Sequence, residues 1–244
     1  MYKKLIKAFV MVGLVALTFG SVPALAEDES PVSASADMSF LSQYVWRGMA
    51  FSDSSIVIQP SVTVSYEGFS INMWGNLDTD SVYTEDNDFN ETDLTLSYDW
   101  SYDSISMGVG YIYYGVPGAN SQELYYTIGF DTILSPSITV YRDIDLTDGW
   151  YVSLGIGHSI AFSDDLALDL SAAVGYTDVE DFSELTDGSI SASMTFAAND
   201  YISITPALTY TFGISGDGKD YLEYYSADAE SDHFFGGVTC SIAF

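Results

Sequence analysis

The sequence predicts an all-β fold: a transmembrane, up-and-down antiparallel β-barrel of about twelve strands that follows a cleaved signal peptide. Three observations support this prediction. The N-terminus has the pattern of a secretory signal, and the segments after it alternate apolar with small or polar residues. The last eight residues, from Gly237 to Phe244, end such a segment on an aromatic side chain, as the closing strand of a membrane barrel does.

The N-terminal signal is built from three lysines, an apolar run from Ala8 to Phe19, and Ala24-Leu25-Ala26 as a small-residue cleavage site. The run is shorter than the ~20 residues that a membrane-spanning helix needs. We therefore expect the chain to be divided into a signal peptide (1–26), a short polar segment (27–36) and the barrel (37–244).

Loop lengths alternate along the chain, as expected of a barrel with short turns on one side of a membrane and long loops on the other. Tight connections are expected at 67–68, 101–103, 133–136, 163–165 and 197–200. Longer ones are expected at 48–55, 79–90, 115–121, 177–187 and 215–231, and helical periodicity is absent. With twelve strands, both termini lie on the side of the short turns.

Aromatic residues fall at both ends of the expected strands, on their apolar face. A soluble sandwich shows the same alternation but has no reason to carry aromatic rings at both rims, whereas a membrane barrel does. The lower ring comprises Tyr66, Phe69, Trp100, Phe130, Phe162, Phe196 and Phe244, and the upper ring comprises Trp46, Tyr113, Trp150, Tyr176, Phe212 and Phe234.

The charge balance excludes nucleic acid as a partner. After loss of the signal peptide only Arg47, Arg142 and Lys219 remain as basic residues against 35 acidic ones, and nucleic-acid binding needs clustered cations. The single cysteine, Cys240, allows no intramolecular disulfide and no cysteine-based metal site. We expect no cofactor.

The first expected hairpin carries a distinctive sequence, Ser42-Gln43-Tyr44-Val45-Trp46-Arg47-Gly48, followed by Ser52-Asp53-Ser54, Gln59-Pro60 and Trp74-Gly75-Asn76. These residues resemble the TorF-type porins, also catalogued as the Gcw_chp family of conserved hypothetical proteins. The similarity in length and strand layout covers essentially the whole mature chain. The resemblance implies an outer-membrane barrel with a pore; the strong acidity of this chain is not part of the family pattern.

Charged residues on the polar face of the strands are candidates for setting ion selectivity. Arg47 is expected at the outer mouth of the lumen, either as a fixed positive charge or paired with an acid such as Asp93; the sequence leaves both readings open. If the lumen is water-filled, the surplus of acids favours cations. The lumen residues expected to matter are Arg47, Asp93, Asp99, Glu123, Asp131 and Asp169.

The expected outer loops are also acidic. Carboxylate clusters can bind divalent cations, although no EF-hand spacing is present and a solvated, repelling surface is the default reading. The possible cation-binding loop residues are Glu85, Asp86, Asp88, Asp178, Glu180 and Asp181. We assign no metal site among them.

Three further residues bear on the alternatives. A phospholipase-like enzyme on this fold needs a Ser–His pair, but neither His158 nor His233 has an evident serine partner, so we assign no catalytic residue. Arg142 falls on the lipid face near mid-strand, where an arginine costs ~2–4 kcal/mol, and the pattern offers no remedy.

The sequence therefore predicts a narrow diffusion channel for small solutes, with cation preference, in the outer membrane of a Gram-negative bacterium. Expected partners are membrane lipid, lipopolysaccharide, small solutes or cations, and the barrel-assembly machinery, which would recognise the strand ending at Phe244. The main alternative is a non-conducting structural or adhesion-type barrel whose acidic loops bind divalent cations.

Overall fold

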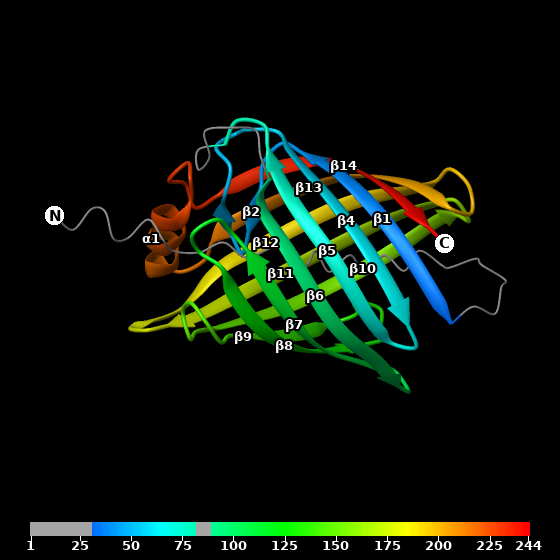
Figure 1. Cartoon of the computed structure of the whole chain (residues 1–244), viewed down its shortest axis with the longest axis horizontal. Helices are drawn as coiled ribbons and strands as arrows, with labels where there is room; N and C mark the ends of the chain where they lie inside the picture. Colours follow the sequence, from blue (N-terminus) through cyan, green and yellow to red (C-terminus); the bar gives the residue numbers. More distant parts are fainter. Residues whose placement is uncertain (1–30, 82–88) are drawn as a thin grey trace.

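Twelve strands form a closed antiparallel barrel within residues 31–81 and 89–244, which are the residues described by the computed structural model (Figure 1). The predicted fold class is confirmed. The predicted signal peptide and loop residues Glu85, Asp86 and Asp88 lie outside the described residues. The barrel strands are β1 (Val32–Leu41), β4 (Val57–Tyr66), β5 (Phe69–Asp78), β6 (Phe89–Tyr102), β7 (Ile105–Gly115), β8 (Ser121–Phe130), β9 (Ser137–Asp143), β10 (Trp150–Ser163), β11 (Leu166–Val179), β12 (Phe182–Ala197), β13 (Ile202–Gly213) and β14 (His233–Ala243).

The barrel closes between its first and last strands. Met38 of β1 pairs with Cys240 of β14, and beyond β14 the backbone N–H of Phe244 donates to the carbonyl of Ala34 at 2.8 Å. Strand β1 begins at Val32, inside the segment predicted as a polar lead up to residue 36. Its Val and Ala side chains alternate with Ser, which is enough to pair with β4 from Val32 onwards.

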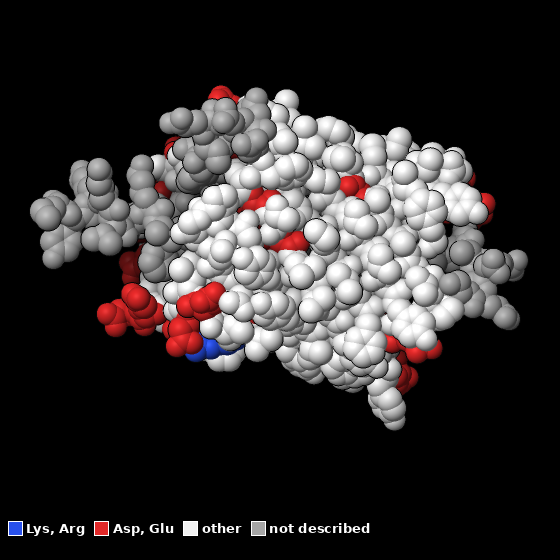
Figure 2. Space-filling view, viewed as in Figure 1, with Lys and Arg blue, Asp and Glu red and all other residues white. Residues whose placement is uncertain are grey.

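The two faces of the wall follow the predicted alternation. Apolar side chains face outward and are exposed, as Val62 and Ile190 show, while small polar side chains such as Ser61 and Ser191 face the lumen. The exposed aromatics at the two rims include Tyr66, Phe69, Phe130, Phe162, Phe196 and Phe244 at the end where β1 begins and β14 ends, and Trp150 and Phe234 at the opposite end. Figure 2 shows a wall with few charged side chains; carboxylates lie at both of its ends, with more of them at the end that carries α1.

The end of the barrel that carries α1 is called the loop end here. No helix in the described part of the chain is both long enough and apolar enough to cross a bilayer. One helix is described, α1 (Gly216–Tyr225), within the connection predicted as one of the longer loops, at 215–231. This helix was not predicted, because its ten residues show no clear helical periodicity. The side-chain oxygen of Ser215 caps it by accepting from the N–H of Gly218.

The connection between β11 and β12 is a second difference from the prediction. A long loop was expected at 177–187, but only Glu180 and Asp181 separate the strands, and Val179 pairs with Phe182. The acidic side chains in this stretch resemble a loop in composition. Backbone pairing nevertheless continues through them because the two strands extend together as a hairpin.

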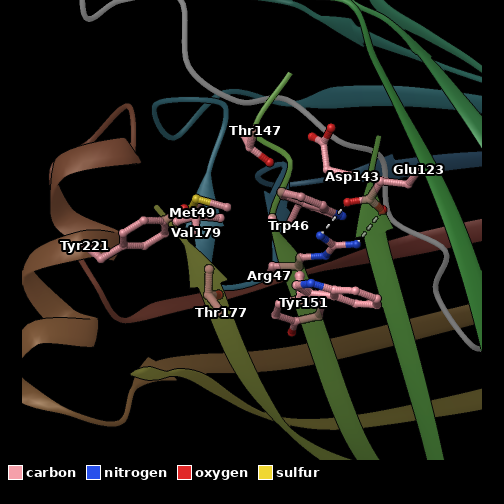
Figure 3. A pocket seen from close by; sticks show the side chains of 12 residues that line it. Trp46, Arg47, Met49, Glu123, Asp143, Thr147, Tyr151, Thr177, Val179 and Tyr221 are labelled. Atoms are coloured by element: carbon pink, nitrogen blue, oxygen red, sulfur yellow. Dashed lines mark hydrogen bonds and ion pairs between the residues drawn. The ribbon is translucent and has the colours of Figure 1, made fainter. Parts of the chain in front are cut away.

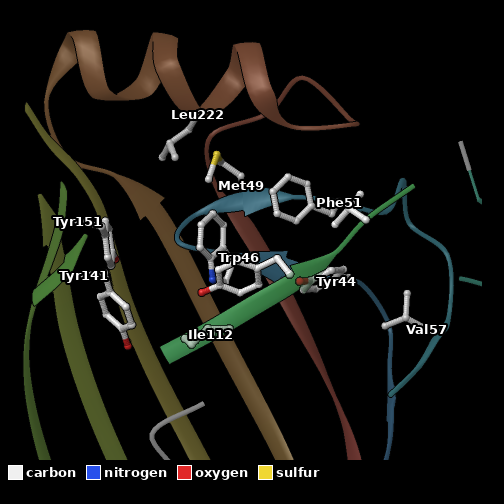
Figure 4. Packing of buried hydrophobic residues seen from close by; sticks show 11 residues of the cluster. Tyr44, Trp46, Met49, Phe51, Val57, Ile112, Tyr141, Tyr151 and Leu222 are labelled. Atoms are coloured by element: carbon white, nitrogen blue, oxygen red, sulfur yellow. The ribbon is translucent and has the colours of Figure 1, made fainter. Parts of the chain in front are cut away.

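The connection between β1 and β4, residues 42–56, folds into the barrel and is called the plug hairpin. It contains β2 (Val45–Trp46) and β3 (Met49–Ala50), which form a two-stranded sheet separate from the wall. Figure 4 shows its side chains packed against lumen-facing residues and against α1. The buried apolar cluster comprises Tyr44, Trp46, Met49, Phe51, Val57, Ile112, Tyr114, Val116, Tyr141, Tyr151 and Leu222.

Trp46 was predicted in the upper aromatic ring, on the apolar face of the first strand. This prediction is wrong, since the side chains of Tyr44 and Trp46 are 1% and 5% exposed and lie inside the barrel. The alternation of Met38 and Phe40 continues numerically into them, but the strand ends at Leu41 and the chain turns inward. Alternation of apolar side chains with a period of two residues reflects the local extended backbone, and it does not reveal where the chain turns inward.

Candidate functional site

The tip of the plug hairpin is a two-residue turn formed by Arg47 and Gly48. Trp46 pairs with Met49, and both turn residues have positive φ, +47° and +79°, as a type I′ turn requires. The turn also needs glycine for space, because a methyl group at position 48 would lie 2.7 Å from Cβ of Asp187. Arg47 is thus presented from a turn inside the barrel; its predicted place on the polar face of a barrel strand is wrong.

Arg47 forms a bidentate ion pair with Glu123 of β8 (Figure 3). Its Nη1 donates to Oε1 at 3.0 Å and its Nη2 to Oε2 at 2.8 Å, and the hydroxyl of Tyr114 donates to Oε2 at 2.9 Å. Of the two readings left open by the sequence, the structure shows a paired arginine, with Glu123 as the partner in place of Asp93. Planar, bidentate pairs of a guanidinium and a carboxylate are among the stronger hydrogen-bonded ion pairs.

Three aromatic rings surround the same guanidinium. Its central carbon lies 4.1 Å from the ring centroid of Trp46, 4.4 Å from that of Tyr141 and 4.1 Å from that of Tyr151. Burial alone would lower the pKa of Arg47, but the carboxylate of Glu123 more than offsets this effect, so the pKa is raised and the side chain stays charged. The plug hairpin is therefore joined to the wall by a desolvated cation.

A second contact joins the plug hairpin to β6. The hydroxyl of Tyr44 donates to Oε2 of Glu91 at 3.0 Å, and both side chains are buried. Burial and the neighbouring carboxylate of Glu91 raise the pKa of Tyr44 well above its usual value, so its hydroxyl remains a donor. Within the hairpin, Oγ of Ser52 accepts from the N–H of Tyr44 at 2.8 Å, which fixes the approach of the two arms.

Little space remains around Arg47. A cavity of about 50 Å³ lies beside its guanidinium, lined among others by Trp46, Glu123, Asp143, Tyr151 and Tyr221. That volume suits one or a few water molecules, so the plug hairpin fills the loop end of the lumen.

The lumen is different toward the end of the barrel where β1 begins and β14 ends. There the wall presents small polar side chains that remain half-buried or exposed, such as Thr63, Ser65 and Ser193. Asp99, which is exposed, and Asp169, which is half-buried, lie in this part of the wall at the inward parity predicted for them. Small, polar and partly accessible linings are what an aqueous path requires.

The remaining predicted lumen acids divide into two groups. Asp93 and Glu123 are 5% and 3% exposed, on the wall of the filled loop end. Asp131 does not lie on a strand, since β8 ends at Phe130; its N–H donates to the carbonyl of Ser104 at 2.8 Å in a turn at the rim. The prediction that Asp131 lines the lumen within a strand is therefore wrong.

The predicted loop carboxylates are not brought together into a metal centre by the described residues. Asp178 is the next-to-last residue of β11, and Glu180 and Asp181 form the tight turn that follows. Over residues 31–81 and 89–244 there is no group of three or more His, Cys, Asp or Glu side chains that could hold a metal ion. Divalent-cation binding by the loops stays a prediction.

Arg142 lies at the loop end of the wall, and its predicted mid-strand depth is wrong. It points outward as predicted, but β9 is short and Arg142 is the residue before its last. Its guanidinium donates to the backbone carbonyl and the carboxylate of Asp148 and lies 4.9 Å from the ring centroid of Trp150. An arginine at the rim, beside an aromatic ring and a carboxylate, avoids the cost of the hydrocarbon core.

The two histidines contact groups other than serine. Nδ1 of His158 lies 2.7 Å from the carbonyl of Ile133, and Nε2 of His233 lies 3.2 Å from Oδ1 of Asp228.

Sequence reasoning missed the partners of the plug hairpin. Tyr141 and Tyr151 have inward parity, and large aromatic rings on a face otherwise built of Ser, Thr and Gly were a signal that something packs against them. Glu91 carried no comparable signal, because an inward acid on a strand end has the same pattern whether it is solvated or buried.

Solved structures share this fold at low sequence identity. The chain resembles a structure described as KdgM porin, with a TM-score of 0.59 and 12% identity over 86% of this chain and 99% of that one. It resembles the NanC porin with a TM-score of 0.58 and 9% identity over 86% and 98% of the two chains. A KdgM porin in complex with disordered oligogalacturonate gives a TM-score of 0.52 at 9% identity over 87% and 98%. At such identities the likeness shows the fold alone.

No curated protein matches the sequence. The sequence pattern of a family described as "Bacterial protein of unknown function (Gcw_chp)" matches residues 25–212, which is most of the chain. The distinctive residues of the plug hairpin lie within this match. The chain therefore belongs to the Gcw_chp family of bacterial proteins.

Proposed function

We propose that this protein is an outer-membrane channel for small solutes that prefers cations and is narrowed at its outer end by the plug hairpin. The location is supported by the exposed apolar wall and by the aromatic side chains at both rims. Structures described as porins share the twelve-stranded layout over nearly their whole length. The loop end is assigned to the outside, because outer-membrane barrels carry their longer loops there. The resemblance to TorF-type porins belongs to the same proposal.

The observation that supports the cation preference is that the positive charge of Arg47 is neutralised by Glu123. Besides Arg47, the mature sequence has only Arg142 and Lys219 as basic residues. Arg142 points outward at the rim, Lys219 lies on α1, and Arg47 is neutralised by Glu123. Asp99 and Asp169 in the more open part of the lumen are thus left without a basic residue opposite them. Negative charges that line a confined path attract cations.

The same charge distribution argues against the ligand of a structural neighbour as a solute of this channel. Oligogalacturonate, present with one KdgM porin, is a polyanion. A lumen whose arginine is already bound to Glu123 offers it no free cation. We propose small cationic or neutral solutes as the cargo.

Ion selectivity in a planar bilayer tests this function. A KCl gradient should give a reversal potential of cation-selective sign, which persists at ~0.1 M salt and fades near ~1 M, because the Debye length falls from about 10 Å to about 3 Å. The double variant Asp99→Asn/Asp169→Asn should reduce the preference, while Asp181→Asn, an exposed acid at the outer turn, should leave it nearly unchanged. Anion selectivity of the wild type would contradict the proposal, and absence of any conductance would favour the structural barrel.

A further inference from the structure

We propose that the loop carrying α1, residues 214–232, is a latch that holds the plug hairpin inside the lumen, and that the channel opens when the latch releases the hairpin. This inference rests on the proposed channel function and adds its control. It follows from three features of the structure: the plug hairpin is not part of the wall, the latch binds it from the outer side, and the latch is itself fixed to the rim.

The plug hairpin can leave the lumen without breaking the barrel. Its strands β2 and β3 pair with each other and not with any barrel strand. The wall remains continuous behind it, because β1 pairs with β4 from Val32 to Leu41 on one side and with β14 on the other. Apart from the chain ends of the hairpin, its links to the wall described above are side-chain contacts, chiefly those of Arg47 and Tyr44.

The latch is hydrogen-bonded to the plug hairpin. The N–H of Ala227 donates to the carbonyl of Ala50 at 2.8 Å, and the N–H of Ala50 donates to Oγ of Ser226 at 3.1 Å. Nearby, Nε2 of Gln43 donates to Oδ2 of Asp228 at 2.8 Å. These bonds hold both arms of the hairpin to one short segment that follows the helix.

The helix of the latch covers the tip of the plug hairpin. Leu222 is fully buried, and a methyl group added at Gly48 would lie 3.1 Å from both of its terminal carbons. Figure 4 shows α1 lying across the hairpin, with Leu222 and Met49 between them. An outward movement of the tip would therefore collide with α1.

The latch is fixed to the rim at both of its ends. At its start, the N–H groups of Ile214 and Ser215 donate to the carbonyls of Thr186 and Leu185 at 3.0 and 3.2 Å. At its end, Oδ1 of Asp232 accepts from the N–H of Gly213 at 3.1 Å. The rings of Tyr221 and Phe182 stack with centroids 4.5 Å apart, which holds the helix against β12. A segment tied at both ends crosses the hairpin as a strap does.

A disulfide between the latch and the plug hairpin tests this directly. Ala50→Cys/Ala227→Cys should be made in a Cys240→Ser background, since Cys240 is exposed on β14. The matched control is Ser191→Cys/Thr209→Cys, a directly paired position on β12 and β13 that joins two strands of the wall and leaves the hairpin free. Oxidation should abolish channel openings in the first pair, and reduction should restore them. Neither treatment should change the openings of the control. Openings that continue in the oxidised latch pair, with the cross-link verified by mass, would overturn the latch.

A second variant covers the case in which the cross-link does not form. Gln43→Ala/Ser226→Ala removes one bonding side chain from each partner and should raise the open probability by roughly fivefold or more, as expected for losing the two hydrogen bonds that these side chains make between the hairpin and the latch. An unchanged open probability would overturn the latch. If a barrel lacking residues 43–55 conducts while these variants behave as wild type, only the latch fails. If that barrel does not conduct either, the channel function fails.

Discussion

At the scale of single residues, the two arginines of the sequence show how surroundings decide what a charge contributes. The side chains of Arg47 and Glu123 are 12% and 4% exposed, so neither charge is hydrated if its partner is removed. Those of Arg142 and Asp148 are 27% and 82% exposed, so water can replace the lost partner. Removing one member of a buried pair is costly, whereas exposed pairs contribute little.

The first prediction follows from this contrast. Arg47→Ala should destabilise the protein by about 3–5 kcal/mol, because Glu123 is left buried and unpaired, and should lower the thermal midpoint measured by circular dichroism in detergent. Arg142→Ala is the matched control and should cost about 1 kcal/mol or less.

The double variant Arg47→Ala/Glu123→Gln separates charge from packing. Because it removes the orphaned carboxylate, it should recover part of the stability lost in Arg47→Ala. Equal losses for the two single arginine variants would show that Arg47 is hydrated, contrary to its place in the structure.

Two glycines with similar backbone angles provide the second prediction. Gly48 and Gly118 have φ of +79° and +85°, but a methyl group at Gly118 would meet nothing within 4 Å. Gly118→Ala should therefore cost only the left-handed backbone, about 1 kcal/mol. Gly48→Ala should cost clearly more, because the methyl group would also press on Asp187 and Leu222. The thermal midpoints of the two variants check this order, and an equal decrease would mean that the tip of the hairpin is not held against α1.

At the scale of elements, the barrel strands could be predicted from the sequence, but the plug hairpin could not. Alternation along Ile190, Ser191 and Ala192 is a local property of an extended backbone with one face in lipid, so it can be read without knowing the partner strands. The inward turn after Leu41 depends on partners far away in the sequence, namely Glu123, Tyr141 and Tyr151. The sequence held two hints of it: Arg47-Gly48 as a pair suited to a turn with positive φ, and the inward aromatic rings of Tyr141 and Tyr151.

Helix α1 was missed for a related reason. Ten residues are too few to show helical periodicity beside Asp217, Asp220 and Glu223, and so short a helix is stable only through its contacts. The local signal was Ser215 as an N-cap, but a single capping residue also occurs in ordinary loops.

The third prediction concerns this cap. Ser215→Ala should cost about 1 kcal/mol and fray the start of α1, because the N–H of Gly218 loses its acceptor. Limited proteolysis of the protein in liposomes should then cleave the 214–232 loop faster than in the wild type. Ser104→Ala, in an exposed turn at the opposite rim, is the control and should leave that cleavage rate unchanged. Equal rates for all three proteins would mean that the cap does not limit opening of the helix.

At the scale of the whole molecule, a closed barrel makes the fourth prediction. Every barrel strand has two neighbours, and the β1–β14 seam is paired from Ser35↔Ala243 to Leu41↔Gly237. Such a barrel has no free edge from which unfolding can start in cold detergent. The purified protein should migrate differently on SDS gels before and after boiling, and identical mobility would contradict closure.

The class of the molecule was predictable because the features of a membrane barrel are distributed over the whole chain. Strand alternation and rim aromatics recur in many strands, and the closing strand adds evidence from the end of the sequence. Misplacing Trp46 or Asp131 therefore did not change the conclusion. Whether the lumen is filled depends on one loop of fifteen residues, 42–56, and no average over the chain contains that information.

Single-channel conductance with and without the plug hairpin tests the central claim most directly. Residues 43–55 would be replaced by a short Gly-Ser linker, which leaves all twelve barrel strands intact. The wild type should show low conductance with rare openings, and the variant a steady, several-fold larger and cation-selective conductance, because the filled end of the lumen is then open. A variant that folds, shifts on boiling and still does not conduct would contradict the account and establish a structural barrel.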